Sequence, residues 1–487
     1  MLKLPELNSL HYGDCLEVMQ QWPDETIDLG YFDPPFNSNA KYHQLYDTKD
    51  DNRGTRDAQL QAFDDAWRWN TTAAERVANL LDAPAHPAHQ VIEAFAKWPG
   101  EGGMLAYLSY MAERIAGLHR LLKPTGSVYL HCDATAAHPL KLLMDCIFGP
   151  ENFRREIVWQ MKSRSGFKSR AANWIRDHDT ILYYAKSDRA TFNKQFEPYS
   201  EEYVARSFTQ KDADGRRYRQ RGNKRYYEDE GGIPYGDVWD DIHSFQTATR
   251  SQEYLGYPTQ KPLKLLERII QASSNEGDIV LDPFCGCGTT VAAADKLNRK
   301  WLGIDISLHA LEVIKLNRFP GRAIPTSGIP ADFAAAAQLA KQNPRHFEVW
   351  ALNCASQGLA PNDVQTGDGG IDGRGHTLLQ PDESNSKLVL AQVKGGKFQL
   401  SQLRDFLWTL EREKAAMGVF ITLNPVTSRN AQAELLRLGT VTVGTETYPR
   451  VQTWSLQEHF KGQRLRMPDM KNPYTGKPLQ PSLQLML

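Results

Sequence analysis

The sequence predicts an α/β protein in which a mostly parallel β-sheet is covered by helices on both faces. Short apolar runs typical of buried strands alternate with segments such as 104–122, where apolar residues recur at helical spacing. After residue 320 the composition changes to prolines, glycines and an alanine-rich stretch, which indicates a linker into a second α/β unit. A length of 487 residues is compatible with about two to four domains.

The composition is that of an ordinary globular protein, with 41% hydrophobic and 24% charged residues. The net charge of −1 by itself favours no partner. No apolar run approaches the ~18 residues of a membrane span, and the N-terminal residues lack a signal-peptide core. The six cysteines are scattered, apart from Cys285 and Cys287, so we expect free thiols and no structural zinc. These features predict a cytoplasmic protein without contact to membranes.

The predicted strand Ile27–Phe32 is followed directly by the candidate catalytic segment Asp33-Pro34-Pro35-Phe36. The two prolines donate no N–H, so the backbone there offers only carbonyl acceptors. Asp33 accepts hydrogen bonds, and the ring of Phe36 can stack on a flat partner. Such a pocket suits a planar base that carries an exocyclic amino group, whereas the tetrapeptide taken alone is also compatible with a simple turn.

Residues 40–100 form a long polar and aromatic insertion directly after this pocket. An insertion of this length beside a pocket is more often functional than idle, so we expect a lid or a DNA-contacting arm. Beyond it, the helix at 104–122 ends at the stop signal Lys123-Pro124-Thr125-Gly126. Further elements are predicted as strands at 127–131, 157–159 and 180–184 and a helix at 139–147.

The segment from Arg154 to Tyr226 is basic. It holds 18 lysines and arginines against 9 aspartates and glutamates, with aromatic residues interleaved. A basic surface with aromatic side chains is the electrostatic footprint of nucleic-acid binding. The alternative for this segment considered alone is a solvated basic face.

A second chemical centre follows the apolar strand that ends at Asp282. Gly286 and Gly288 permit positive φ and close approach of a ligand, and the next helix directs its N-terminal N–H groups at the turn. Asp305 ends the next strand, 23 residues after Asp282, which is the spacing of an acid that binds ribose hydroxyls. A third glycine is missing, so the turn favours a single nucleoside over a dinucleotide.

Taken together, the two centres resemble the amino-methylating DNA methyltransferases of the permuted, beta order, in which the catalytic tetrapeptide precedes the S-adenosylmethionine loop. Gly13-Asp14-Cys15 looks like the family's contact to the cofactor adenine, and 257–262 looks like the segment that closes over its methionine. The resemblance covers about 8–320. The cofactor-binding residues that it implies are Asp14, Cys15, Lys261, Asp282, Phe284, Gly286, Gly288, Thr289 and Asp305.

The resemblance implies a Rossmann-like S-adenosylmethionine-dependent methyltransferase domain with an inserted target-recognition region at about 160–250. It implies base flipping from double-stranded DNA, with Asp33, Pro34, Pro35 and Phe36 as the catalytic residues. Asp33 and the carbonyl of Pro34 would accept the two amino hydrogens, and Phe36 would stack on the extruded base. An aspartate rather than a serine at position 33 resembles adenine-N6 enzymes more than cytosine-N4 enzymes.

The C-terminal part carries a second set of candidate catalytic residues. Gln392 and Lys394 stand two apart on the predicted strand 388–394, so they share one face. Asp372 lies 20 residues before Gln392 and can meet them across a hairpin. An acid and a nearby lysine can hold Mg²⁺ and stabilise the charge that develops on a phosphoryl group.

This part resembles the Mrr-like restriction endonucleases, which implies an α/β restriction-endonuclease-like domain. A helix at 401–417 and a strand at 418–422 follow the catalytic strand. Gln392 stands where many nucleases of this fold carry a glutamate, and a glutamine is usual in Mrr-like members. Glu348 is a candidate for a further acid, so the implied metal ligands are Asp372 and Glu348. The alternative is a degenerate nuclease fold retained for DNA binding or assembly.

The predicted domain organisation is a methyltransferase at 1–320, a linker at 321–343, a nuclease domain at 344–450 and a tail at 451–487. The predicted function is adenine-N6 DNA methylation within a restriction–modification system, with an Mg²⁺-dependent endonuclease domain. One alternative is cytosine-N4 methylation with an inert nuclease-like DNA-binding domain, and another is methylation of amines in RNA or protein. The sequence leaves open the recognition site and whether the chain forms a homodimer.

Overall fold

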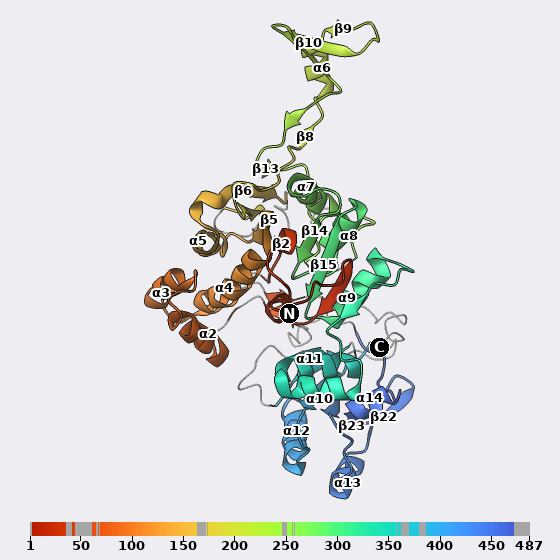
Figure 1. Ribbon diagram of the computed structural model, residues 1–487. Coiled ribbons are helices and arrows are strands. Elements are labelled where there is room, and N and C mark those ends of the chain that lie inside the picture. The colour runs from red at the N-terminus through yellow and green to blue at the C-terminus, as the bar shows by residue number, and fades with distance from the viewer. Residues whose placement is uncertain are drawn as a thin grey trace.

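The computed structural model in Figure 1 describes residues 2–35, 41–43, 61–64, 67, 69–162, 172, 174–245, 251–255, 257, 259–356, 358–361, 370–378 and 386–471. Among these residues no helix is long and apolar enough to cross a membrane. All six cysteines are free, as the sequence predicts.

A nine-stranded sheet, here called the large sheet, forms the centre of the N-terminal part. Its strands are β1 (Ser9–Tyr12), β2 (Ile27–Phe32), β5 (Leu122–Cys132), β6 (Phe153–Gln160), β7 (His178–Ala185), β13 (Val238–Trp239), β14 (Ile279–Asp282), β15 (Lys300–Asp305) and β16 (Thr326–Ser327). Their order is β13-β6-β7-β5-β2-β14-β15-β1-β16. β7 is antiparallel to both of its neighbours, and the other neighbouring pairs are parallel. The predicted mostly parallel sheet is therefore confirmed.

Helices cover both faces of the large sheet. On one face lie α1 (Cys15–Met19), α4 (Gly103–Leu121) and α5 (Ala137–Phe148), with α2 (Thr71–Leu81) and α3 (His89–Lys97) packed outside α4. On the other face lie α7 (Leu263–Ser273), α8 (Thr289–Lys296) and α9 (Leu308–Val313), which continues into a π-helical turn, Ile314–Arg318. A 3₁₀ turn, Pro150–Asn152, precedes β6, and β3 (Lys41–His43) pairs with β4 (Gln61–Asp64) within the predicted insertion.

The junction between α4 and β5 differs from the prediction. The sequence predicts a four-residue stop before a strand at 127, but β5 starts at Leu122, where the backbone is already extended at φ −68° and ψ 133°. Gly126 lies so close to β2 that an added Cβ would be 3.0 Å from the carbonyl oxygen of Asp28. Leu122 pairs with Ile27 of β2, but regular pairing resumes only at Ser127, so residues 123–126 bulge out of the ladder. The predicted turn is therefore present as an irregularity inside β5.

A segment between β7 and β13 leaves the body of the protein and stands away from it in Figure 1. Residues 196–234, here called the arm, begin and end in a two-stranded stem, β8 (Phe196–Glu197) and β12 (Ile233–Pro234). The outer end holds α6 (Glu201–Ser207) and a three-stranded sheet of β9 (Gln210–Lys211), β10 (Arg217–Arg221) and β11 (Lys224–Tyr227). The arm lies inside the predicted target-recognition region.

A five-stranded sheet, here called the small sheet, forms the centre of the C-terminal part. Its strands, in spatial order, are β17 (Ala360–Pro361), β18 (Gly373–His376), β19 (Leu388–Lys394), β20 (Met417–Thr422) and β23 (Val451–Ser455). Its helices are α10 (Phe333–Gln342), α11 (Pro344–Ala355), α12 (Leu400–Arg412), α13 (Arg429–Arg437) and α14 (Leu456–Phe460), and β21 (Thr440–Val443) pairs with β22 (Glu446–Pro449). The predicted α/β architecture of this part is confirmed.

Two boundaries lie elsewhere than the sequence predicts. The segment expected as a tail from 451 starts with β23, which pairs in parallel with β20 and completes the small sheet. The segment expected as a linker contains α10, which packs on α11. The predicted helix 401–417 is shorter as α12, because Lys414 takes a positive φ of 55° and the next residues enter β20.

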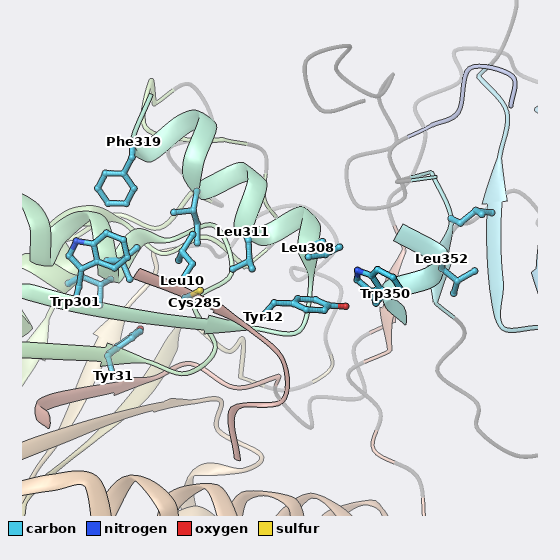
Figure 2. Close-up of a cluster of buried hydrophobic side chains, with 14 of the residues drawn as sticks. Leu10, Tyr12, Tyr31, Cys285, Trp301, Leu308, Leu311, Phe319, Trp350 and Leu352 are labelled. Atoms are coloured by element: carbon cyan, nitrogen blue, oxygen red, sulfur yellow. The ribbon is translucent and has the colours of Figure 1, made fainter. Parts of the chain in front are cut away.

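The two sheets share one continuous cluster of buried apolar side chains. Figure 2 shows Trp350 of α11 beside Tyr12 of β1 and Leu308 of α9. The ring of Tyr12 also packs on His346, with ring centroids 4.6 Å apart. Asn343 Nδ2 donates to Glu17 Oε1 at 2.8 Å, which adds a polar contact at the edge of this junction.

Candidate active sites

Asp33 stands at the carboxyl end of β2 and is held by a lysine from a distant part of the chain. Lys261 Nζ donates to Asp33 Oδ2 at 2.5 Å, and both side chains are about nine-tenths buried. Pro34 is buried and Pro35 half-buried, whereas Phe36 lies outside the described residues. The predicted acceptor is therefore present at a strand end, and a cation covers one of its two oxygens.

A buried polar chain lies behind Asp33, and the sequence gives little sign of it. Tyr31 Oη is 2.9 Å from His131 Nδ1, and His131 Nε2 is 3.2 Å from Asp179 Oδ2. Burial opposes ionisation of Asp179, but the bond from His131 and the charges of Arg176 and Lys261 hold the pKa of this carboxyl below its usual range. Burial and the nearby carboxylates raise the pKa of Tyr31, so its hydroxyl stays protonated. Of these residues, Tyr31 lines the small cavity that Asp33 also borders.

The glycine turn and Asp33 border the same small cavity, of about 40 Å³. The residues around it include Tyr31, Asp33, Lys261, Asp282, Phe284, Gly286 and Thr289. A nucleoside-sized ligand must widen this space when it enters. Burial raises the pKa of Asp282 to about 7, with the negative charges of Asp33 and Asp305 acting in the same direction. A hydroxyl-rich or cationic ligand there compensates this buried carboxyl.

Asp305 connects the glycine turn with the loop after β1. Its Oδ2 accepts from Gly286 N at 2.8 Å and its Oδ1 from Ser307 N at 2.8 Å. Its carbonyl oxygen accepts from Gly13 N at 3.0 Å, which places the Gly13-Asp14 turn beside it. Burial raises the pKa of Asp305 to about 6. The residues expected to hold the adenine, the ribose and the methionine end of the cofactor thus adjoin one another at one sheet edge.

Asp14 and Cys15 have structural roles that sequence motifs do not reveal. Asp14 caps α1 by accepting from Leu16 N at 2.8 Å, and its second oxygen pairs with the buried guanidinium of Arg114. The Cys15 side chain is buried in the core, and burial raises the pKa of its thiol to about 12. Any contact of Cys15 with the cofactor therefore comes from its backbone, while Asp14 retains one partly exposed edge.

Replacing Gly288 with valine is expected to weaken S-adenosylmethionine binding about tenfold or more. Gly288 has a φ of +76°, and an added Cβ would lie 2.6 Å from Ile314 Cγ1. Both the strained backbone and the displaced neighbour distort the turn that faces the ligand. Calorimetric titration with the cofactor measures the effect.

Gly277→Val is the matched control for Gly288→Val. Gly277 has a φ of +85° but open space around its Cβ position, so it carries the backbone strain without the contact. Affinity for DNA should change little in either variant. Equal cofactor affinity in Gly288→Val and the parent would place the ligand elsewhere.

The second candidate site lies on the small sheet. Asp372, just before β18, accepts from Val393 N at 2.7 Å, and Lys394 Nζ is 3.9 Å from its Oδ2. Burial and the charge of Asp372 raise the pKa of Glu348 on α11, whose Oε2 lies 3.4 Å from Arg345 Nη1. The structure therefore brings Asp372 and Lys394 together, and Glu348 is a nearby carboxyl that is paired with an arginine.

Gln392 completes this site and bears on whether a metal fits it. Its Nε2 donates to Gly370 O at 3.0 Å, while its Oε1 is buried without a hydrogen-bond partner among the described residues. A buried amide oxygen of this kind is a ligand that Mg²⁺ accepts together with carboxylates. The described residues hold no group of three or more His, Cys, Asp and Glu side chains suited to a metal, so a site here needs the glutamine.

Sequence reasoning missed the residues that support these sites. Three of them are buried polar or charged side chains inside otherwise apolar elements: Arg114, His131 and Asp179. A polar residue within an apolar run is the one sequence signal that indicates such a supporting role. Their partners lie 48 to 100 residues away in the chain. Lys261 was predicted as a cofactor residue, and its contact with Asp33, 228 residues away, could not be foreseen.

Comparison with protein families places both parts of the chain. A family model described as DNA methylase matches residues 27–316, and one described as restriction endonuclease matches residues 339–445. The type II methyltransferase M.BamHI of Bacillus amyloliquefaciens is 30% identical over 315 residues, which cover 64% of this chain and 56% of M.BamHI. The DNA adenine methyltransferase YhdJ of Escherichia coli (strain K12) is 26% identical over 308 residues, covering 63% of this chain and 81% of YhdJ.

Among solved structures, the PvuII DNA methyltransferase (cytosine-N4-specific) aligns with a TM-score of 0.38 and 15% identity, covering 66% of this chain and 89% of that one. The chain spans a little over half the length of curated relatives such as M.BamHI. The first family model alone covers more than half of the chain. The protein therefore belongs to the DNA methylase family and carries a restriction endonuclease domain in its C-terminal part.

Proposed function

We propose that the protein transfers a methyl group from S-adenosylmethionine to the N6 of adenine in double-stranded DNA, as part of a restriction–modification system. The observation that carries this proposal is the shared cavity of Asp33 and the glycine turn, since an amine acceptor and a nucleoside site must adjoin for methyl transfer. The aspartate at position 33 and the similarity to a DNA adenine methyltransferase favour adenine. Cytosine-N4 methylation with an inert nuclease-like domain is the alternative.

The residues present fit the cofactor. Asp305, which accepts from Gly286 N, would bind the ribose hydroxyls, and Asp14 in the adjoining loop would contact the adenine. Asp282, Phe284 and Thr289 line the cavity beside the glycine turn that contains Gly288. The cofactor supplies an electrophilic methyl group on a sulfonium. Burial raises the pKa of Asp282, and a cationic ligand beside it would lower that pKa again, so that the carboxylate form would be favoured when the ligand is bound.

The chain's own groups prepare the base for attack. An exocyclic amine is a poor nucleophile because its lone pair is delocalised into the ring. Asp33 and the carbonyl of Pro34 accept its two N–H groups, which favours a pyramidal nitrogen with an available lone pair. Lys261 occupies Asp33 Oδ2, so it has to shift or share that oxygen when a base enters. Positioning and charge placement supply most of the acceleration.

We further propose that the C-terminal domain is an Mg²⁺-dependent endonuclease. Asp372, Glu348 and the free oxygen of Gln392 would hold the metal, which stabilises charge on a phosphate. Lys394 lies where it can stabilise the developing negative charge. Such an enzyme acts on chromosomal and incoming DNA in the cytoplasm, and a second copy of the chain is a candidate partner, because two such centres together can cut both strands in one binding event.

Sequencing with modified-base detection tests the methyltransferase proposal. Purified full-length protein, S-adenosylmethionine and unmodified plasmid DNA are incubated without divalent metal, so that no cleavage interferes. We expect N6-methyladenine within one sequence motif, and we expect the majority of the copies of that motif to be methylated. N4-methylcytosine would establish the alternative chemistry, and DNA without any modified base would refute both.

A further inference from the structure

The outer end of the arm is a small folded unit with its own support. Arg219 of β10 lies among aromatic rings, with its guanidinium carbon 5.2 Å from the ring centroid of Phe208. Arg219 Nη1 donates to Tyr203 Oη at 2.6 Å. α6 and β10 are thereby tied together, which gives the hairpin of β10 and β11 a fixed base. Arg219 is a structural residue here and is unavailable to a ligand.

The charges of the arm are unevenly compensated. Arg216, at the base of the hairpin, pairs with Asp229 and Glu230, each at 2.7 Å. At the opposite end, Arg221 and Asn223 are exposed and have no side-chain partner among the described residues. Asp229 and Glu230 therefore neutralise the charge of Arg216 where the hairpin starts, and the tip of the hairpin stays cationic.

The tip is a tight two-residue turn. Arg221 pairs with Lys224 across the ladder, and Gly222 between them has a φ of +57°. A two-residue hairpin of this kind is narrow and rigid. The major groove of B-DNA, about 12 Å wide, admits a two-stranded β-ribbon. The tip thus has the shape, the charge and the separation from the body that groove entry requires (Figure 1).

We propose that the turn 221–224 enters the major groove and that Arg221 and Asn223 determine sequence specificity by contacting base edges. Guanidinium groups pair in bidentate fashion with guanine O6 and N7, and carboxamides pair likewise with adenine N6 and N7. Lys224 beside them contacts phosphate, because an ammonium carries charge without that bidentate geometry. The inference rests on the proposed methyltransferase function and names the part of the arm that selects the site.

The test compares the methylated motif of full-length Arg221→Ala and Asn223→Ala with that of the parent, on unmodified plasmid DNA in EDTA. We expect each variant to methylate DNA at a motif in which one position is relaxed, with discrimination there reduced about 10- to 100-fold. Arg217→Ala is the control: its exposed side chain lies on the same strand, four residues from Arg221. It should lower the methylation rate evenly across sequences and keep the motif.

Three further outcomes would overturn the proposal. The parent motif at the parent rate in both variants would show that the tip does not contact DNA. An even loss across all sequences, with a weaker salt dependence, would show phosphate contacts alone. A change in sedimentation with an unchanged motif would make the tip a contact between copies of the chain. Parent protein that leaves no modified base would instead refute the proposed function, and calorimetry with S-adenosylmethionine checks that each variant is folded.

Discussion

Asp33→Ala is expected to abolish measurable methyl transfer to DNA while the protein still binds S-adenosylmethionine. In the proposed mechanism Asp33 accepts a hydrogen bond from the amino group, and loss of one such preorganised hydrogen-bonding group lowers the rate of the chemical step by about 100- to 1000-fold or more. Its ion pair with Lys261 is lost as well, but the glycine turn and Asp305 keep their mutual contacts. Transfer of tritium from labelled cofactor, alongside calorimetry of cofactor binding, measures the two effects separately.

Asp24→Ala is the control for this substitution, because Asp24 is also ion-paired but lies on the surface, with Arg120. It should leave both the transfer rate and the cofactor affinity unchanged. Turnover near the parent value in Asp33→Ala would rule out the proposed mechanism. A parallel loss of cofactor affinity would instead mean that Asp33 and Lys261 hold the cofactor.

The second large effect is expected in living cells. Cells that express Asp33→Ala should lose viability, because an active nuclease then meets unmethylated sites, whereas cells that express Asp33→Ala with Asp372→Ala should grow normally. Removing a carboxylate that is proposed to hold Mg²⁺ should take away several kcal/mol of transition-state stabilisation, which lowers cleavage about a thousandfold or more. Plating efficiency from an inducible promoter, with genomic DNA examined for breaks, compares the single and the double variant.

Purified protein separates this effect from general toxicity. Lys394→Ala should fail to cut unmethylated plasmid with Mg²⁺ but should still methylate it. Lys397→Ala is the control and should both cut and methylate the plasmid, because Lys397 is exposed beyond the end of β19. Normal growth of Asp33→Ala, together with uncut plasmid in the parent protein, would show that the domain is no nuclease. It would then be the inert nuclease-like fold of the alternative, retained for DNA binding or assembly.

Local sequence patterns predicted the elements well where burial and periodicity decide the structure. The strand Ile27–Phe32 and the strand Leu388–Lys394 have the predicted bounds, and the helix 104–122 is displaced by a single residue at each end. These patterns indicate which face of an element is buried. They do not indicate which segment packs on that face, because that segment comes from elsewhere in the chain.

The candidate sites show the same limit. Proline and glycine at fixed offsets identified the two turns, since few residues tolerate those backbone conformations. The pairing of Lys261 with Asp33 depends on how α7 crosses the large sheet, and no local pattern encodes that crossing. The orphaned oxygen of Gln392 likewise appears only once Gly370 is placed against its amide nitrogen.

The packing of Tyr12 against His346 and Trp350 bears on how this chain changes over generations. Because one apolar cluster runs through both sheets, a gene shortened after α9 would encode a protein with Tyr12 and Leu308 newly exposed to water. Exposed apolar patches of that kind promote aggregation. Lineages that no longer need the nuclease should therefore lose it by point substitution at residues such as Asp372, with the full-length chain inherited intact.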